Sequence, residues 1–190
     1  MSTNVHWNYF LAIEGDLERL SKFIEFDKEN FHCFSIEIAR ILLSSAAEVD
    51  VVCKEICRKL NPISSADSIN NYRDEIRMAY PGILNFEVMF PRHGLSLTPW
   101  NSWNDSDGVP VWWTAYNKIK HHRNTEYYRA NLENALNAVG GLFVLVLYLY
   151  KEKAELGELG PSPKLLHVSE DRFRGISHAG FTLNFVYDLR

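Results

Sequence analysis

Apolar residues recur every three or four positions along most of the chain, which is the spacing of one face of an α-helix. The most regular run lies at residues 30–60. Its members are Phe34, Ile38, Ile41, Ser45, Val49, Val52, Ile56 and Leu60. We predict one long amphipathic helix there, about 45 Å long at 1.5 Å per residue, ended by Asn61 and Pro62.

Three further segments have the same helical spacing. The first covers residues 6–26 and the second residues 66–79. The third covers residues 112–153, and as one helix it would be about 60 Å long, which exceeds the diameter of a domain of this size. We therefore expect a break in it where Asn124 or Thr125 can cap the final helix.

The period changes to two at residues 85–98. Apolar and polar side chains alternate on both sides of the turn-forming segment 91–94, which predicts a β-hairpin with a four-residue loop. The tail, residues 157–190, ends in a second alternating run. Its members are Phe181, Leu183, Phe185 and Tyr187. This run predicts a last strand that can join the hairpin.

The pattern as a whole indicates a mainly α (α+β) fold. It predicts a helical bundle with a long central helix, a core formed by residues 6–153 and a small antiparallel β-hairpin appendage. A length of 190 residues, 46% hydrophobic and 23% charged, fits a single globular domain spanning residues 1–190. We find no internal repeat and no linker of inter-domain length.

Several features favour a cytoplasmic protein without membrane spans. Three cysteines are a small and odd number for a disulfide framework, and no signal-peptide pattern is found near the N-terminus. The most apolar run, residues 138–150, is shorter than the roughly 20 residues that a bilayer requires. We interpret it as a helix buried on most of its sides.

The sequence predicts neither a metal site nor a cofactor site. No two of the seven histidines have the helical spacing of a ligand pair, and Cys53 and Cys57 lack the further ligands that zinc requires. No glycine-rich phosphate-binding motif is found. We interpret both cysteines as apolar core residues.

Charge and aromatic residues concentrate in one region. The net charge of −4 argues against nucleic-acid binding over the whole surface, but residues 112–130 carry four cations and one carboxylate, a local net charge of +3. Five large aromatic side chains lie within the 17 residues 100–116, directly before the first of these cations, Lys118. They are Trp100, Trp103, Trp112, Trp113 and Tyr116.

Helical spacing brings the polar residues of this region together. Asn117 and His121 are four residues apart and so share one helix face, with Lys120 close to it. Glu48 lies at the margin of the apolar stripe of the long helix, where a carboxylate requires a cation, and His121 or Arg123 could supply it. An asparagine ladder, at three-residue steps from 131 to 137, predicts a polar network or a partly solvated face.

The segment YNKIKHHR, residues 116–123, is followed by a helix that begins polar and turns apolar. Over residues 30–153 the chain resembles the HEPN superfamily of small all-helical bacterial and archaeal domains. Nuclease members of that family share an arginine followed, after four to six residues, by a histidine. They typically dimerise to form a metal-independent RNase site, in which the histidine helps move the proton of a ribose 2′-hydroxyl and the arginine steadies the phosphate.

The resemblance carries over to this chain only in part. His121 matches the histidine, and Asn117 and Lys118 match the polar positions before it. Positions 114–116, where the arginine is expected, hold no arginine. The resemblance therefore supports the fold more directly than it supports catalysis, and whether the chain is an enzyme stays open.

Two functions follow from these observations. The first is an RNA-directed protein, a metal-independent endoribonuclease or a toxin or defence effector. Its catalytic residues would be His121, Asn117 and Glu48, and its substrate-binding residues Lys118, Lys120, Arg123 and Tyr116. The second is a non-catalytic module that binds a second copy or a cognate protein, with the same cluster as a structural hydrogen-bond network. Trp100 and Trp103 would then be contact residues, unless they pack across the hairpin.

Overall fold

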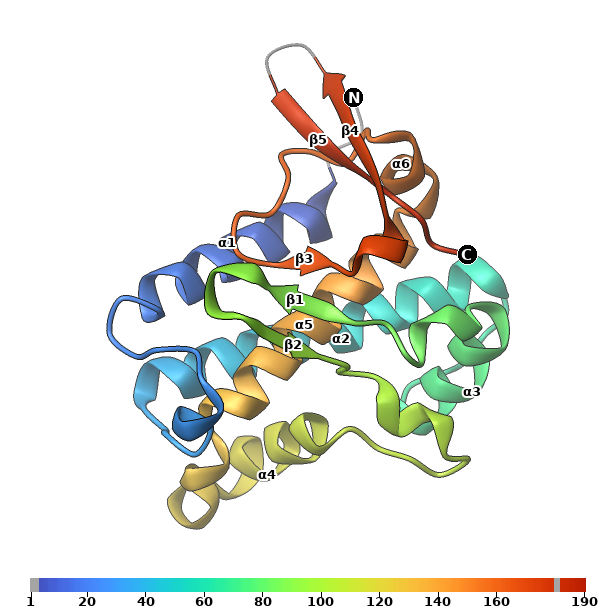
Figure 1. The fold of residues 1–190 in the computed structure, drawn as a ribbon. Helices are drawn as coiled ribbons and strands as arrows, with labels where there is room; N and C mark the ends of the chain where they lie inside the picture. Colours follow the sequence, from blue (N-terminus) through green and yellow to red (C-terminus); the bar gives the residue numbers. More distant parts are fainter. Residues whose placement is uncertain (1–3, 180–181) are drawn as a thin grey trace.

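The computed structural model describes residues 4–179 and 182–190, and it confirms a mainly α fold with small antiparallel sheets. Figure 1 shows α5 running through the middle of the molecule, beside α2 and beneath the strands β1 and β2. In the same view α4 and the β4–β5 hairpin lie at opposite ends. The helices of the described residues are α1 Val5–Leu20, α2 Ile36–Leu60, α3 Ile69–Ala79, α4 Val111–Glu126, α5 Leu132–Leu149 and α6 Lys151–Leu156.

The long helix α2 begins later than its apolar pattern predicts. The hydroxyl of Ser35 accepts the backbone N–H of Ile38 at 3.1 Å and caps the helix there, whereas residues 28–30 form a separate 3₁₀ turn. The C-terminus at Leu60 is as predicted, since Pro62 follows closely. With 25 residues the helix is about 37 Å long, and its apolar face packs against α5.

The other helix boundaries move for similar local reasons. The helix α1 ends at Leu20 instead of continuing to residue 26. Ser68 caps α3 by accepting the N–H of Asn71, so this helix begins at residue 69. The predicted break after α4 is found, but neither Asn124 nor Thr125 caps α5. That cap is Asn131, whose side chain accepts the N–H of Asn134 at 3.0 Å.

The predicted hairpin is confirmed. Strand β1, Val88–Phe90, pairs antiparallel with β2, Leu95–Leu97. The turn between them ends at Gly94, whose φ of 59° is a left-handed conformation that favours glycine. Residues 88 and 97 stand opposite one another in the register, as do residues 90 and 95.

The last strand does not join this hairpin, so that prediction is wrong. The strand that extends the sheet is the two-residue β3, His167–Val168, which pairs with the other edge of β1. Strand β5, Thr182–Tyr187, pairs instead with β4, Phe173–Ala179, in a separate two-stranded sheet. Phe181, the first residue of the predicted strand, lies outside the described residues.

The centre of the core is α5, which is buried on nearly all sides. By length and composition alone this helix could cross a membrane, but 89% of it is covered by the rest of the fold. The sequence-based interpretation of residues 138–150 as a buried helix is therefore confirmed. Its N-terminal end meets α4, and that junction positions the candidate site.

Candidate functional site

Helix α4 has one buried and one exposed face, and the candidate residues lie mainly on the exposed one. Trp112, Ala115, Tyr116 and Ile119 follow helical spacing and are buried against the domain. The exposed side chains are those of Asn117, Lys118, Lys120, His121 and Arg123. The apolar residues thus anchor the helix and hold its polar side chains toward solvent.

The structure brings Asn117 and His121 together. Both line a cleft of about 340 Å³, which we call the histidine cleft. Its full lining is Ile69, Val109, Trp113, Thr114, Asn117, Lys118, His121 and His122. The amide of Asn117 donates to the carbonyl oxygen of Trp113 at 3.2 Å, one turn earlier in α4, which orients its side chain.

The cleft includes His122, which sequence reasoning did not select. His122 has φ −135° and ψ 39°, a non-helical conformation that kinks α4. Its ring lies 6.4 Å from that of His121, measured between centroids, and both residues line the histidine cleft. Within the described ranges, neither imidazole makes a hydrogen bond or an ion pair.

A second cleft of about 360 Å³ lies beside the first, and we call it the lysine cleft. Its lining is Asp50, Asp67, Ser68, Ile69, Trp113, Tyr116, Asn117 and Lys120. The ammonium of Lys120 lies 5.6 Å from the ring centroid of Tyr116, within the range of a cation–π contact. Tyr116 is itself only 8% exposed and belongs to the face of α4 that packs against the domain. The side chains of Trp113 and Asn117 line both clefts.

Three cations of α4 form no ion pair with a carboxylate among the residues that the structure describes, although the charge of Lys118 acts on Glu126 from a greater distance. Lys118 and Lys120 each line one of the two clefts. Arg123 lines neither and instead has its guanidinium 5.9 Å from the ring centroid of Tyr127. Arg129 differs from them, since it forms an ion pair with Glu126. Unpaired cations on an exposed surface favour the binding of an anion.

The prediction that Glu48 pairs with His121 or Arg123 is wrong. Its carboxylate oxygen lies 2.6 Å from Nδ1 of His6, on α1. The other ring nitrogen of His6, Nε2, lies 2.9 Å from a carboxylate oxygen of Glu55. The edge of the apolar face of α2 at Glu48 therefore packs against α1, and Glu48 does not belong to the candidate site.

The prediction that Trp100 and Trp103 contact a partner is also wrong. Both indoles are completely buried, and their ring centroids are 4.2 Å apart. Trp100 packs edge-on against Trp112 as well. These residues fill the space between α5 and the loop that follows β2, so they act as core residues and not as an exposed surface.

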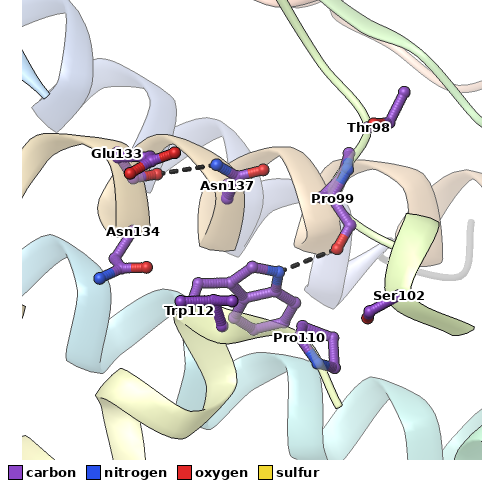
Figure 2. Close-up of a pocket in the computed structure, with 9 residues that line it drawn as sticks. Thr98, Pro99, Ser102, Pro110, Trp112, Glu133, Asn134 and Asn137 are labelled. Carbon is purple, nitrogen blue, oxygen red and sulfur yellow. Dashed lines mark hydrogen bonds between the residues drawn. The ribbon is translucent and has the colours of Figure 1, made fainter. Parts of the chain in front are cut away.

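Two residues of the asparagine ladder, Asn134 and Asn137, line a third, smaller cavity of about 230 Å³ (Figure 2). The side-chain amide of Asn134 donates to the carbonyl oxygen of Arg129, and that of Asn137 donates to the carbonyl oxygen of Glu133, each at 3.0 Å. Trp112 forms part of the wall and donates to the carbonyl oxygen of Pro99. Asn134 and Asn137 thus satisfy backbone carbonyls at and just before the start of α5, and they border a cavity with both polar and apolar walls.

Outside these clefts we also searched the described residues for groups of side chains that could bind a metal ion. No group of three histidine, cysteine or acidic side chains suited to a metal ion occurs in residues 4–179 and 182–190. Comparisons of the chain with models of protein families, with curated proteins and with solved structures find no match. The two clefts of α4 and their cations are therefore the candidate functional site.

Proposed function

We propose that the exposed face of α4 binds RNA and that the protein is a divergent, metal-independent endoribonuclease, of the kind used by toxin or defence effectors. One observation carries the proposal. His121 and Asn117 share a cleft at whose rim Lys118 lies, while Lys120 and Arg123 extend from the same helix without carboxylate partners. An imidazole beside unpaired cations can exchange a proton with a substrate that the cations hold.

The chemistry assigns a role to each group. His121 accepts the proton of a ribose 2′-hydroxyl, so that its oxygen can attack the adjacent phosphorus. Lys118 holds phosphate oxygens in the histidine cleft, and Lys120 binds a neighbouring phosphate from the lysine cleft, which Asp50 and Asp67 also line. Asn117, which lines both clefts, orients the ribose or the phosphate. This arrangement requires no bound metal, and it is similar to the expectation that the HEPN resemblance raises.

The direct test is RNA cleavage in the presence of EDTA. Wild type and His121→Ala are incubated with single-stranded and structured RNA that carries a 5′ label. We expect fragments that end in a 2′,3′-cyclic phosphate with the wild type, and a loss of about 100-fold or more in rate for the variant. His178→Ala is the matched control, because His178 is also exposed but belongs to β4, at the opposite end of the molecule from α4 (Figure 1). Equal cleavage by wild type and His121→Ala would refute the proposal.

A second candidate function is binding of another protein chain without catalysis. It is favoured by an exposed apolar pair, Phe23 at 88% and Ile36 at 75% exposure, where α1 ends and α2 begins. Phe23 lines a cleft together with Ser35 and Glu37, the two neighbours of Ile36. If this pair mediates self-association, light scattering should show a dimer for the wild type and a monomer for Phe23→Ser.

A further inference from the structure

Two consecutive histidines of α4 line one cleft. The histidine cleft spans a wide side of the helix, since it also takes the consecutive residues Asn117 and Lys118, and His122 lies four residues after Lys118. His121 and His122 both line this cleft, and their ring centroids are 6.4 Å apart at a point where the backbone of His122 leaves the helical conformation. Neither ring has a hydrogen-bond partner among the described residues, so both can interact with a ligand.

Cleavage of RNA through its 2′-hydroxyl uses two proton transfers. One group removes the proton of the hydroxyl, and another protonates the 5′-oxygen that leaves. The attacking and the leaving oxygens stand on opposite sides of the phosphorus, so the two groups have to be separate and have to face each other across the phosphate. Imidazole suits both roles, because it changes its protonation state between pH 5 and 8.

We infer that His122 is the general acid of this site and that it acts opposite His121. The inference rests on the proposed function. The O–H bond of the 2′-hydroxyl breaks and its proton passes to neutral His121, while a new bond forms from the 2′-oxygen to phosphorus. The bond from phosphorus to the 5′-oxygen breaks, and this oxygen takes a proton from protonated His122. The products are a 2′,3′-cyclic phosphate and a 5′-hydroxyl, and the two histidines exchange their protonation states.

The surroundings of the two rings fit this reaction. Lys118 lines the same cleft and can hold the charged non-bridging oxygens between the rings. The side chain of Asn117 is oriented by its bond to the carbonyl oxygen of Trp113. No carboxylate lines the histidine cleft, so the described residues place no acidic competitor for phosphate there. The indole of Trp113 offers an apolar wall for a base.

The test uses an RNA whose scissile 5′-oxygen is replaced by sulfur, because a thiolate leaves without being protonated. The variant His122→Asn removes the acid and keeps a polar side chain that suits non-helical backbone. On ordinary RNA we expect it to cleave about 100-fold or more slowly than the wild type. On the sulfur-containing RNA we expect its rate to return to within about tenfold of the wild type, while His121→Ala stays slow on both substrates.

The outcomes separate the inference from the proposed function. If His121→Ala is inactive and His122→Asn cleaves ordinary RNA at the wild-type rate, the proposed function stands and the inference is refuted. If His122→Asn cleaves ordinary RNA slowly and its rate does not recover on the sulfur-containing RNA, His122 only shapes the helix, and the inference is also refuted. Absence of cleavage by the wild type would overturn both. Circular dichroism and RNA affinity of His122→Asn, compared with those of His178→Ala, establish that the variant is folded and binds substrate.

Discussion

The indole N–H of Trp100 donates a hydrogen bond to the carbonyl oxygen of Gly141 at 3.1 Å, inside the buried helix α5. The ring of Trp112 also closes on Gly141. A β-carbon at this position would lie 3.0 Å from a ring carbon of Trp112 and 3.4 Å from one of Trp100. The absence of a side chain at Gly141 therefore lets two tryptophan rings pack directly against α5.

This contact predicts opposite effects for two adjacent glycines. Gly141→Ala should destabilise the fold by about 1–3 kcal/mol, because hydrogen bonds to Gly141 and to Pro99 fix the two rings that would have to move. Gly140→Ala is the matched control. Its β-carbon would meet Val88 at an ordinary 3.6 Å, and the gain in helix propensity should leave it as stable as the wild type or more so.

The measurement is the free energy of unfolding in urea for both variants. A Gly141→Ala protein as stable as Gly140→Ala would contradict the packing that we describe.

The carboxylate of Glu14 holds the segment that leads to β3. This side chain is only 4% exposed, and it accepts the backbone N–H groups of Lys164, Leu165 and Leu166 at 3.1, 2.8 and 3.0 Å. In Glu14→Gln an NH₂ group would face at least one of these donors. We expect a loss of about 1–3 kcal/mol in stability and faster amide exchange at residues 164–166.

Glu18→Gln is the control for this prediction. Glu18 lies on the same helix but is partly exposed, and its nearest cation, Arg92, is 4.0 Å away, so its replacement should change stability by less than about 0.5 kcal/mol. Equal stability of the two variants would show that Glu14 does not anchor the segment.

The three thiols should differ sharply in reactivity. Cys33 is exposed, whereas Cys53 and Cys57 are buried. Burial, with a further contribution from Glu75, raises the pKa of Cys57 to about 12, and burial also raises the pKa of Cys53. A raised pKa keeps a thiol protonated at neutral pH, and the thiolate is the reactive form.

We therefore expect one thiol per native chain to react with Ellman's reagent at pH 7.5, and all three to react in denaturant. Cys33→Ser should abolish the fast native reaction. Rapid labelling of a second thiol in that variant would contradict the burial of the α2 cysteines.

Much of the fold follows from local signals, and these were the predictable parts. Pro62 ends α2, and the segment before Gly94 turns the hairpin, because these residues restrict their own backbone. Strand pairing is different. The alternation at Phe185 requires a sheet face but does not specify its neighbour, and the two residues of β3 are too short to produce a periodic signal.

The same distinction holds for the candidate site. Helical spacing alone brings Asn117 and His121 to one face, and the structure places them in one cleft. Sequence reasoning did not select His122, although it lies four residues after Lys118 and both line the same cleft. Nor could it identify the partner of Glu48, because a helix stripe does not tell which neighbouring helix packs against each of its margins.

Asp188 should make the C-terminal region sensitive to acid. Hydrogen bonds from Arg190, and then from Arg174, hold the pKa of its carboxyl well below its usual value. A group whose pKa is lower in the folded state stabilises the fold above its unfolded pKa, near 3.8, and loses that effect as the pH falls toward the folded value.

The variant Asp188→Asn removes this titration while keeping the shape of the side chain. We expect thermal unfolding to show the variant clearly less stable than the wild type at pH 7, with a difference that narrows below about pH 4. All other groups titrate in both proteins, so the difference isolates Asp188. A gap that stays constant between pH 7 and pH 3 would contradict the assignment.

The unpaired cations of α4 should determine how RNA binding depends on salt. Each phosphate that a lysine or arginine neutralises releases counterions, so the logarithm of the binding constant falls by about 0.7 per contact for each tenfold increase in salt on single-stranded RNA. Lys118→Ala and Lys120→Ala should each weaken binding and lower this slope by about 0.7.

Arg123 lines neither cleft, so Arg123→Ala should have a smaller effect. Lys22→Ala, an exposed lysine at the far end of α1, is the matched control and should keep the wild-type slope. Slopes that are equal in all four variants would show that the RNA, if bound, contacts another surface of the protein.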